Sequence, residues 1–343
     1  MRNCLLCNEN PADKKGSHIV PHFLSKRIDN EPGQSGRDKE MGFVITEDST
    51  TSYFGRAVQP EKLEEIYGEV TDELIENNDI DGIEDNYFCS DCETNLAIVE
   101  SEYAKTITSN SEIDKNYESI KKPFIGFLFW ISIVWRLSIQ EYSGFKLKPK
   151  EEKKLGRILK NYLKPDINEI KLDEKDSDLN DIGYKLLRAP NFSNENSTWL
   201  HWSAFYERPY SLVIDEFILF VYFKKSHLKG MIMDFYGSED SKQKADFNTP
   251  FQPESVYGLS FDKYKTVSEK ITMFGVRKRM ESLGKKLDLL HQKLDGEGKQ
   301  MHPKLKNEIL KRIANSDVEL GNKHTTENHI KIIIETMMEL NNT

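Results

Sequence analysis

Cys4-Leu5-Leu6-Cys7 opens the chain, and Cys89-Ser90-Asp91-Cys92 repeats its spacing after a long interval. These two stretches hold all four cysteines of the 343 residues. A Cys-x2-Cys pair at a tight turn directs two thiolates at one point, and two such pairs complete a tetrahedral zinc site. The interval is tolerable, because the cost of closing a loop grows only with the logarithm of its length. The sequence therefore predicts one structural zinc ion, with four buried thiols as the alternative.

The composition suits a protein of two domains with ordinary cores, since 37% of the residues are hydrophobic and 31% are charged. The net charge is −9 and the pI is about 5.6. These values exclude a globally basic surface for nucleic acid, so any such contact must use a local patch.

The start of the chain has no apolar signal core, and the paired cysteines argue against a disulfide framework. The most apolar run, residues 124–135, has twelve residues, which are too few to span a bilayer. We therefore expect a cytoplasmic protein with no membrane contact.

The periodicity of apolar residues predicts helices in most of the chain and strands near residue 220. A weak hairpin is expected at residues 42–45, and residues 166–198 read as polar loops with short elements. Helices are predicted to start near Phe23 and after Cys92, and to cover residues 63–74, 123–142, 150–163, 267–294, 303–315 and 326–340; strands are predicted for 210–214, 217–223 and 231–235.

Between the two cysteine pairs lies Ser17-His18-Ile19-Val20-Pro21, and Glu93 directly follows the second pair at a predicted helix start. An imidazole that titrates near neutrality can take a proton from water, and a carboxylate can hold a hard divalent cation. A base and a metal ion in this arrangement are what phosphodiester hydrolysis needs. The alternative for His18 is a structural histidine at the end of a strand.

These motifs resemble the HNH endonucleases, the ββα-metal nucleases with zinc knuckles, and in particular the branch with Ser-His-Ile-Ile/Val-Pro followed by Cys-x2-Cys-Glu. The resemblance covers roughly residues 1–105. It implies that His18 is the general base, that Glu93 lies at a catalytic Mg²⁺ or Mn²⁺ ion, and that Cys4, Cys7, Cys89 and Cys92 hold structural Zn²⁺.

The chain departs from that family at several positions. Ser17 stands where an acidic residue is common, Glu93 where His or Asn is usual, and the lysine that often follows the knuckle is absent. The middle asparagine has two candidates, Asn86 and Asn95, of which Asn95 is carried as a catalytic candidate. These departures keep open a second hypothesis, a catalytically decayed zinc-stapled module that binds nucleic acid or protein.

Further side chains are candidates on weaker grounds. His22 and Glu100 share helical spacing with His18 and Glu93, with a partly exposed His and a salt-bridged or exposed Glu as the alternatives. Arg136 in the apolar helix is expected to pair with a carboxylate or reach the surface. Aromatic residues at 199–206 could stack bases, although aromatic core is the simpler interpretation. The candidates for phosphate contact are Lys14, Lys15, Lys26, Arg27, Lys153, Arg157 and Lys160, each with a solvated surface charge as the alternative.

The sequence thus predicts an α+β protein. A small treble-clef or ββα-metal zinc domain at residues 1–105, with an insertion near 28–85, precedes a mainly helical domain at 106–343 that has a short antiparallel sheet for recognition or partner docking. The predicted function is a metal-dependent HNH-type endonuclease, a hydrolase acting on nucleic acid, with DNA as the first choice. The resemblance also suggests bacterial antiviral defence or restriction, with a protein partner from such a system. Target sequence and oligomeric state are left open.

Overall fold

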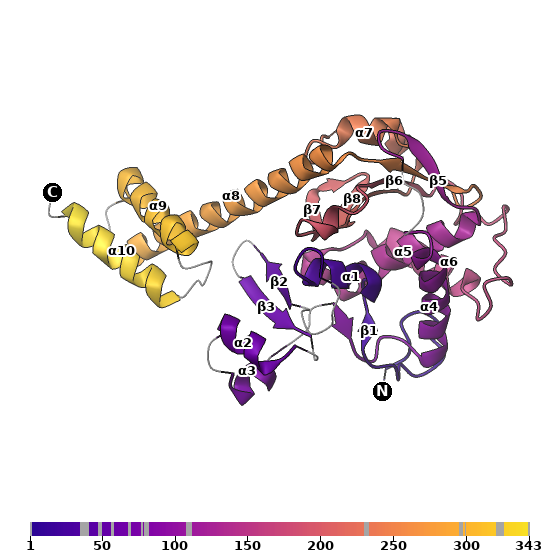
Figure 1. Cartoon of the computed structure of the whole chain (residues 1–343), viewed down its shortest axis with the longest axis horizontal. Helices are drawn as coiled ribbons and strands as arrows, with labels where there is room; N and C mark the ends of the chain where they lie inside the picture. Colours follow the sequence, from indigo (N-terminus) through magenta and orange to yellow (C-terminus); the bar gives the residue numbers. More distant parts are fainter. Residues whose placement is uncertain are drawn as a thin grey trace. The chain divides into compact units, whose positions relative to one another are not determined.

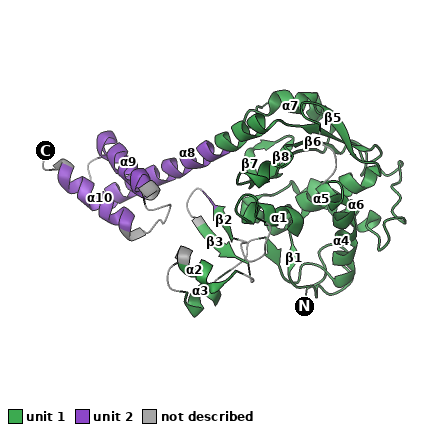
Figure 2. Ribbon diagram, in the orientation of Figure 1, with its two compact units in different colours: residues 1–44, 51–270 green, residues 45–50, 271–343 purple. Residues whose placement is uncertain are grey.

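The computed structural model describes residues 2–34, 41–46, 50–55, 58–67, 70–76, 78, 82–107, 112–229, 233–294, 298, 300–319 and 326–341. All statements about structure below concern these residues. The chain forms two compact units, one of residues 1–44 and 51–270 and the other of residues 45–50 and 271–343 (Figure 2).

Unit 1 is built on a six-stranded sheet, which Figure 1 shows beneath the label α7. Its neighbours are antiparallel except for β10 and β6, which run parallel. The strand order is β5 (Asn116–Ile120), β10 (Glu254–Gly258), β6 (Gly183–Arg188), β9 (Phe217–Tyr222), β8 (Tyr210–Asp215) and β7 (Trp199–Glu207).

Helix α5 (Pro123–Gln140) is the centre of the core. It packs against β5 and β10 of the sheet, and also against α4 (Ser90–Ala104) and α6 (Pro149–Tyr162). Pro123 occupies its first turn, where proline needs no hydrogen bond. The helix has 18 residues and extends beyond the twelve-residue apolar run, so by length and composition it could cross a membrane; yet 78% of it is buried inside the protein, as in a core helix.

A buried carboxylate joins α5 to the sheet. Glu254 on β10 accepts hydrogen bonds from Tyr103 (2.9 Å), Trp130 (3.1 Å), Ser119 and Tyr184. Burial raises the pKa of Glu254, while these donors act in the opposite direction by stabilising the carboxylate. Gly126 lets the helix approach, because a Cβ there would lie 2.5 Å from Glu254 Oε2.

One apolar core runs through the whole of unit 1. Cys4, Leu24 and Val99 from the front segment belong to the same cluster of buried residues as Phe129 of α5 and Leu219 of the sheet. The boundary predicted near residue 105 therefore falls inside a shared core, where α4 packs on α5. The front segment and the sheet are not separate compact bodies in this structure.

The insertion after α1 (His22–Asp29) contains its own small cluster. The strands β2 (Met41–Ile45) and β3 (Thr50–Phe54) form a two-stranded sheet, as the predicted hairpin required. The helix predicted for residues 63–74 is instead two short helices, α2 (Pro60–Tyr67) and α3 (Asp72–Glu76).

Most predicted elements of the second half are present, but the sheet is larger than expected. Strands β8 and β9 match their predictions, whereas β5, β6, β7 and β10 were missed, and β6 lies in the segment predicted as loops with short elements. The sheet is also mixed rather than antiparallel. Residues 233–235 are not a strand, and the first two residues of that predicted strand lie outside the described part.

Unit 2 contains the part of α8 (Phe261–Lys293) from Ile271 onward, together with α9 (Pro303–Glu319) and α10 (Thr326–Asn341). Helices α9 and α10 pack on each other (Figure 1). The core of unit 2 includes Leu287 of α8 and Ile309 and Ile313 of α9, all at most 4% exposed.

Candidate metal centre and catalytic site

The four cysteines converge on one point. Their sulfur atoms all lie within 4.8 Å of one another, and the sulfurs of Cys7 and Cys89 are 3.9 Å apart. Tetrahedral zinc with bonds of about 2.3 Å places its sulfur ligands about 3.8 Å apart. Within the described residues, they form the one group of three or more His, Cys, Asp or Glu side chains that converges in this way. The donor set therefore suits a single Zn²⁺ ion.

Local turns place the sulfurs. In the first pair, the Cys4 amide donates to the Asn10 carbonyl (2.8 Å) and the Asn8 amide donates to the Cys4 carbonyl (2.9 Å). Asn8 has a φ of 59°, a left-handed conformation that asparagine tolerates well. In the second pair, Cys89 caps the N-terminus of α4 and Cys92 lies in its first turn. Both pairs are therefore shaped by their own neighbours in sequence.

The surroundings of the sulfurs differ between the two knuckles. Burial raises the pKa of Cys7, but hydrogen bonds with the amides of Asn10 and Glu9 and with the thiols of Cys4 and Cys89 together lower the pKa to about 7. Burial raises the pKa of Cys92. Since zinc takes thiolates, the ion would supply the positive charge that the buried sulfurs need. Lys160 of α6 binds the turn after the first cysteine pair: it donates to the Cys7 carbonyl and to the Glu9 carboxylate, at 2.8 Å each.

The candidate catalytic site consists of His18 and Glu93, and His18 lies on a short strand. Strand β1 (Ser17–His18) pairs antiparallel with β4 (Ile83–Glu84), and the chain then continues through the second cysteine pair into α4. The Gly16 amide donates to Asp85 Oδ1 (2.7 Å), which fixes the start of β1. The order is strand, strand, helix, with the cysteine pair at the helix start.

A side-chain hydrogen bond joins β1 to α4. Ser17 is fully buried, and its Oγ donates to Glu93 Oε2 at 3.1 Å. The ring of the half-buried His18 lies 5.2 Å, centroid to centroid, from the ring of His22 on α1. Ser17, directly before the predicted base, therefore contacts Glu93. Sequence reasoning treated Ser17 only as a lost metal ligand and missed this contact.

Arg136 of α5 binds the backbone of β1. It is 1% exposed, and its guanidinium donates to the His18 carbonyl (2.8 Å) and to Glu100 Oε1 (2.6 Å). Burial raises the pKa of Glu100, and Arg136 counteracts this. The pairing predicted for Arg136 is confirmed, and Glu100 is the salt-bridged Glu of the alternative hypothesis. An arginine inside an apolar helix was the sequence signal for this ion pair.

Three residues predicted to touch phosphate form ion pairs within the chain. Arg27 forms an ion pair with the buried Asp215. Arg157 forms a bidentate ion pair with both carboxylate oxygens of Asp178 (2.7 and 2.9 Å). Lys160 is bound to the first knuckle, as described above. Of the remaining candidates, Lys14, Lys15 and Lys153 are exposed and Lys26 is half-buried.

The two asparagine candidates occupy different settings. Asn86 adopts a left-handed φ of 60° in the turn after β4, and its backbone bonds to Lys14 (2.7 Å) and Arg2 (2.6 Å). Asn95 lies half-buried on α4, two residues after Glu93. The contacts of Asn86 fit a turn residue, and Asn95 stays a prediction.

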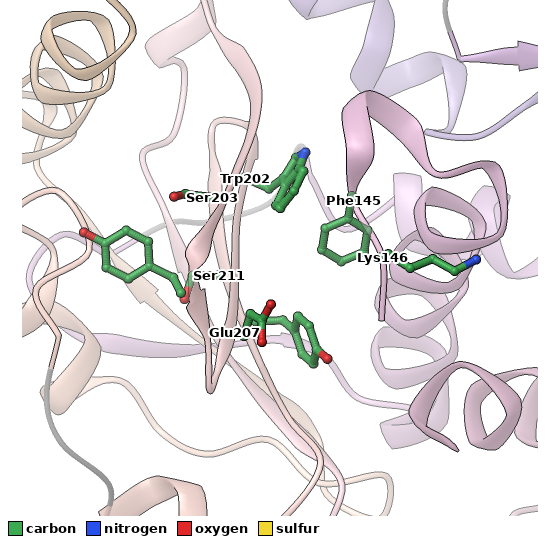
Figure 3. A pocket seen from close by; sticks show the side chains of 8 residues that line it. Phe145, Lys146, Trp202, Ser203, Glu207 and Ser211 are labelled. Atoms are coloured by element: carbon green, nitrogen blue, oxygen red, sulfur yellow. The ribbon is translucent and has the colours of Figure 1, made fainter. Parts of the chain in front are cut away.

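Most aromatic residues of β7 pack against other side chains of the protein, although Phe205 is 61% exposed. Trp202 meets Phe145 edge-on at 5.4 Å, and His201 Nε2 lies 3.0 Å from the Tyr236 hydroxyl. Burial lowers the pKa of His201 to about 4. Figure 3 shows the hollow beside Trp202, which Tyr206 also lines; its volume is about 10 Å³, far below the roughly 300 Å³ of small-molecule sites. This region suits aromatic core better than base stacking.

No family model matches the chain, and neither a curated protein nor a solved structure is significantly similar to it. The functional assignment therefore rests on the residues and contacts described above.

Proposed function

We propose that the chain is a metal-dependent endonuclease of the HNH type that hydrolyses phosphodiester bonds, with DNA as its first candidate substrate. One observation carries the proposal: the hydrogen bond from Ser17 to Glu93, which ties the strand of His18 to the first turn of α4. The resemblance of the sequence motifs to HNH nucleases supports the same assignment. The strand pair followed by α4 is compatible with the ββα-metal arrangement.

In this proposal the four cysteines hold a structural Zn²⁺ ion that fixes the start of α4. Glu93 would hold Mg²⁺ or Mn²⁺, which proteins bind through one or two carboxylates with water and phosphate oxygens completing the shell. The ion would neutralise charge on the leaving oxygen. His18 would take a proton from the attacking water, and Ser17 would orient the Glu93 carboxylate.

A second function is favoured by a specific observation. Arg27, Arg157 and Lys160 are engaged in ion pairs within the chain, and Glu100 is paired with Arg136. Fewer charged groups are then available for phosphate and for a second metal contact. A zinc-stapled binding module that no longer cleaves is consistent with this arrangement.

A cleavage assay separates the two functions. Plasmid DNA and RNA are incubated with wild type, His18→Ala and Glu93→Gln, with Mg²⁺, with Mn²⁺ and with no added divalent ion. Omission of the ion is preferable to a strong chelator, because a chelator would also remove zinc. His302→Ala is the matched control, since His302 is exposed on unit 2.

The nuclease proposal predicts cleavage by wild type and the control that needs the divalent ion, and a loss of at least about 100-fold in both site variants. Binding of nucleic acid without cleavage under every condition would support the binding module instead. Cleavage that the His18 and Glu93 variants retain would exclude this site as its source. Repeating the assay with the products of neighbouring genes tests activation by a defence-system partner.

A further inference from the structure

Helix α10 is apolar on more than one face. Its inner face contributes side chains to the core of unit 2 and packs beside α9. A second row, Ile330, Ile334 and Met338, lies outside that core with exposures of 50%, 47% and 63%. The inner residues are Ile332, Ile333, Thr336 and Met337.

The outer row has the spacing of a packing ridge. Ile330, Ile334 and Met338 are four residues apart, so they form one i±4 ridge along the helix surface. Two such ridges that interdigitate give the commonest crossing of helices in globular proteins, at about −50°. A three-residue ridge centred on Ile334 is also symmetric about its middle. It can therefore pack against a second copy of itself across a twofold axis, as an isologous contact requires.

The charges beside the ridge are complementary under that symmetry. Lys331 and Glu335 follow Ile330 and Ile334 in sequence and form the next row on the helix surface. They make a long ion pair of 4.0 Å, with side-chain exposures of 71% and 55%. In an antiparallel pair of helices centred on Ile334, Lys331 of one copy lies near Glu335 of the other. The exchange occurs twice, because the axis repeats it.

Met273 and Val276 of α8 lack this property. Met273 and Val276 are 72% and 53% exposed, but Arg277, Lys278 and Arg279 follow directly. Two copies that paired through this stretch would bring like charges together, which opposes association. The charge pattern thus favours α10 as the surface for a second copy.

We propose that two copies of this chain associate through α10, by antiparallel packing of the Ile330–Ile334–Met338 ridge with reciprocal Lys331–Glu335 pairs. Three partly exposed side chains per copy bury less than the about 1,200 Å² of stable interfaces. The dimer is therefore weak, and its population depends on protein concentration. The proposal is independent of the nuclease assignment.

The test is sedimentation velocity of the full chain over a wide range of micromolar concentrations. Wild type is expected to show a concentration-dependent monomer–dimer equilibrium. Ile334→Glu should raise the dissociation constant by more than about tenfold, because the symmetric contact loses the side chain twice. Ile113→Glu is the matched control, since Ile113 is equally exposed, at 47%, in unit 1. Far-UV circular dichroism checks that helix content is unchanged.

Charge exchange makes the test specific to this pairing. Lys331→Glu and Glu335→Lys should each weaken the dimer, and the double variant should restore it, because the reciprocal pairs are then rebuilt with their signs reversed. A wild-type chain that stays monomeric at every concentration would overturn the proposal. So would a dimer that survives Ile334→Glu, or single charge variants that the double variant does not rescue.

Discussion

The cysteine cluster and the His18–Glu93 region lie on the same two segments of chain, yet they are assembled differently. The four thiols converge within 4.8 Å, and each pair is shaped by a turn or helix start of its own. In the second region, a side-chain hydrogen bond from Ser17 joins β1 to α4, and Arg136 of the distant helix α5 binds the backbone of β1. Each half of the first site is therefore shaped mainly by local turns, whereas the second site depends on contacts with α5.

Removing the metal should have the largest effect. Structural zinc in small domains contributes apparent binding energies of about 10–16 kcal/mol, so its loss should unfold the front segment. Cys92→Ser is expected to lower the melting temperature of unit 1 by at least about 10 °C, as measured by calorimetry. Ser101→Ala, an exposed change on the same helix, should leave it unchanged. A Cys92→Ser protein that melts like wild type would show that the cluster does not stabilise the fold.

Removing the Arg136–Glu100 ion pair beside β1 should have the next largest effect on stability. Arg136→Met leaves Glu100 without its cation and the His18 carbonyl without its donor, which should lower the free energy of unfolding by about 3–5 kcal/mol in urea. The control Arg157→Met breaks a more exposed pair and should cost less than about 1 kcal/mol.

Adding Glu100→Gln to Arg136→Met should recover part of the loss, because the buried charge is then absent. If Arg136→Met and Arg157→Met lowered the free energy of unfolding equally, the contrast between a buried and an exposed ion pair would be wrong.

The half-buried His201 of β7 should make the stability of the fold depend on pH. Burial lowers the pKa of His201 from 6.5 to about 4, so between these values the unfolded chain binds more protons than the folded one. Stability should therefore fall as the pH falls from 6.5 to 4, by on the order of 2 kcal/mol.

Urea unfolding at several pH values measures this slope, which His201→Gln should reduce and His302→Gln should leave unchanged. An unaltered slope in His201→Gln would assign the titration to other groups.

The bond between β1 and α4 should have the smallest effect on stability. Ser17→Ala removes the donor to Glu93 and should cost about 1 kcal/mol, while Ser25→Ala, which loses a 3.4 Å bond to the His22 carbonyl, should cost less. Urea unfolding compares the two. If Ser17→Ala lowers metal-dependent cleavage far more than it lowers stability, the role proposed for the bond in orienting Glu93 is supported; equal small losses would assign it to packing.

The sequence predicted the parts of this structure that local patterns encode. The spacing of Cys4, Cys7, Cys89 and Cys92 was sufficient for the cluster, because each knuckle closes over a few residues. The apolar run at 123–142 was sufficient for α5. The α+β class followed from the same periodicity.

Non-local pairing limited the rest. Strands β5 and β10 are neighbours although they lie more than a hundred residues apart, and no local pattern specifies such a partner. The Ser17–Glu93 bond and the Arg136–His18 contact likewise join distant segments. The roles of His18, Glu93 and Asn95 therefore stay predictions, whereas the cysteine cluster is confirmed.

X-ray absorption at the zinc edge of the purified chain tests the central claim most directly. A single Zn²⁺ ion held by Cys4, Cys7, Cys89 and Cys92 predicts four sulfur neighbours at about 2.3 Å and one zinc per chain. A protein without zinc, or zinc with nitrogen or oxygen among its nearest neighbours, would contradict it.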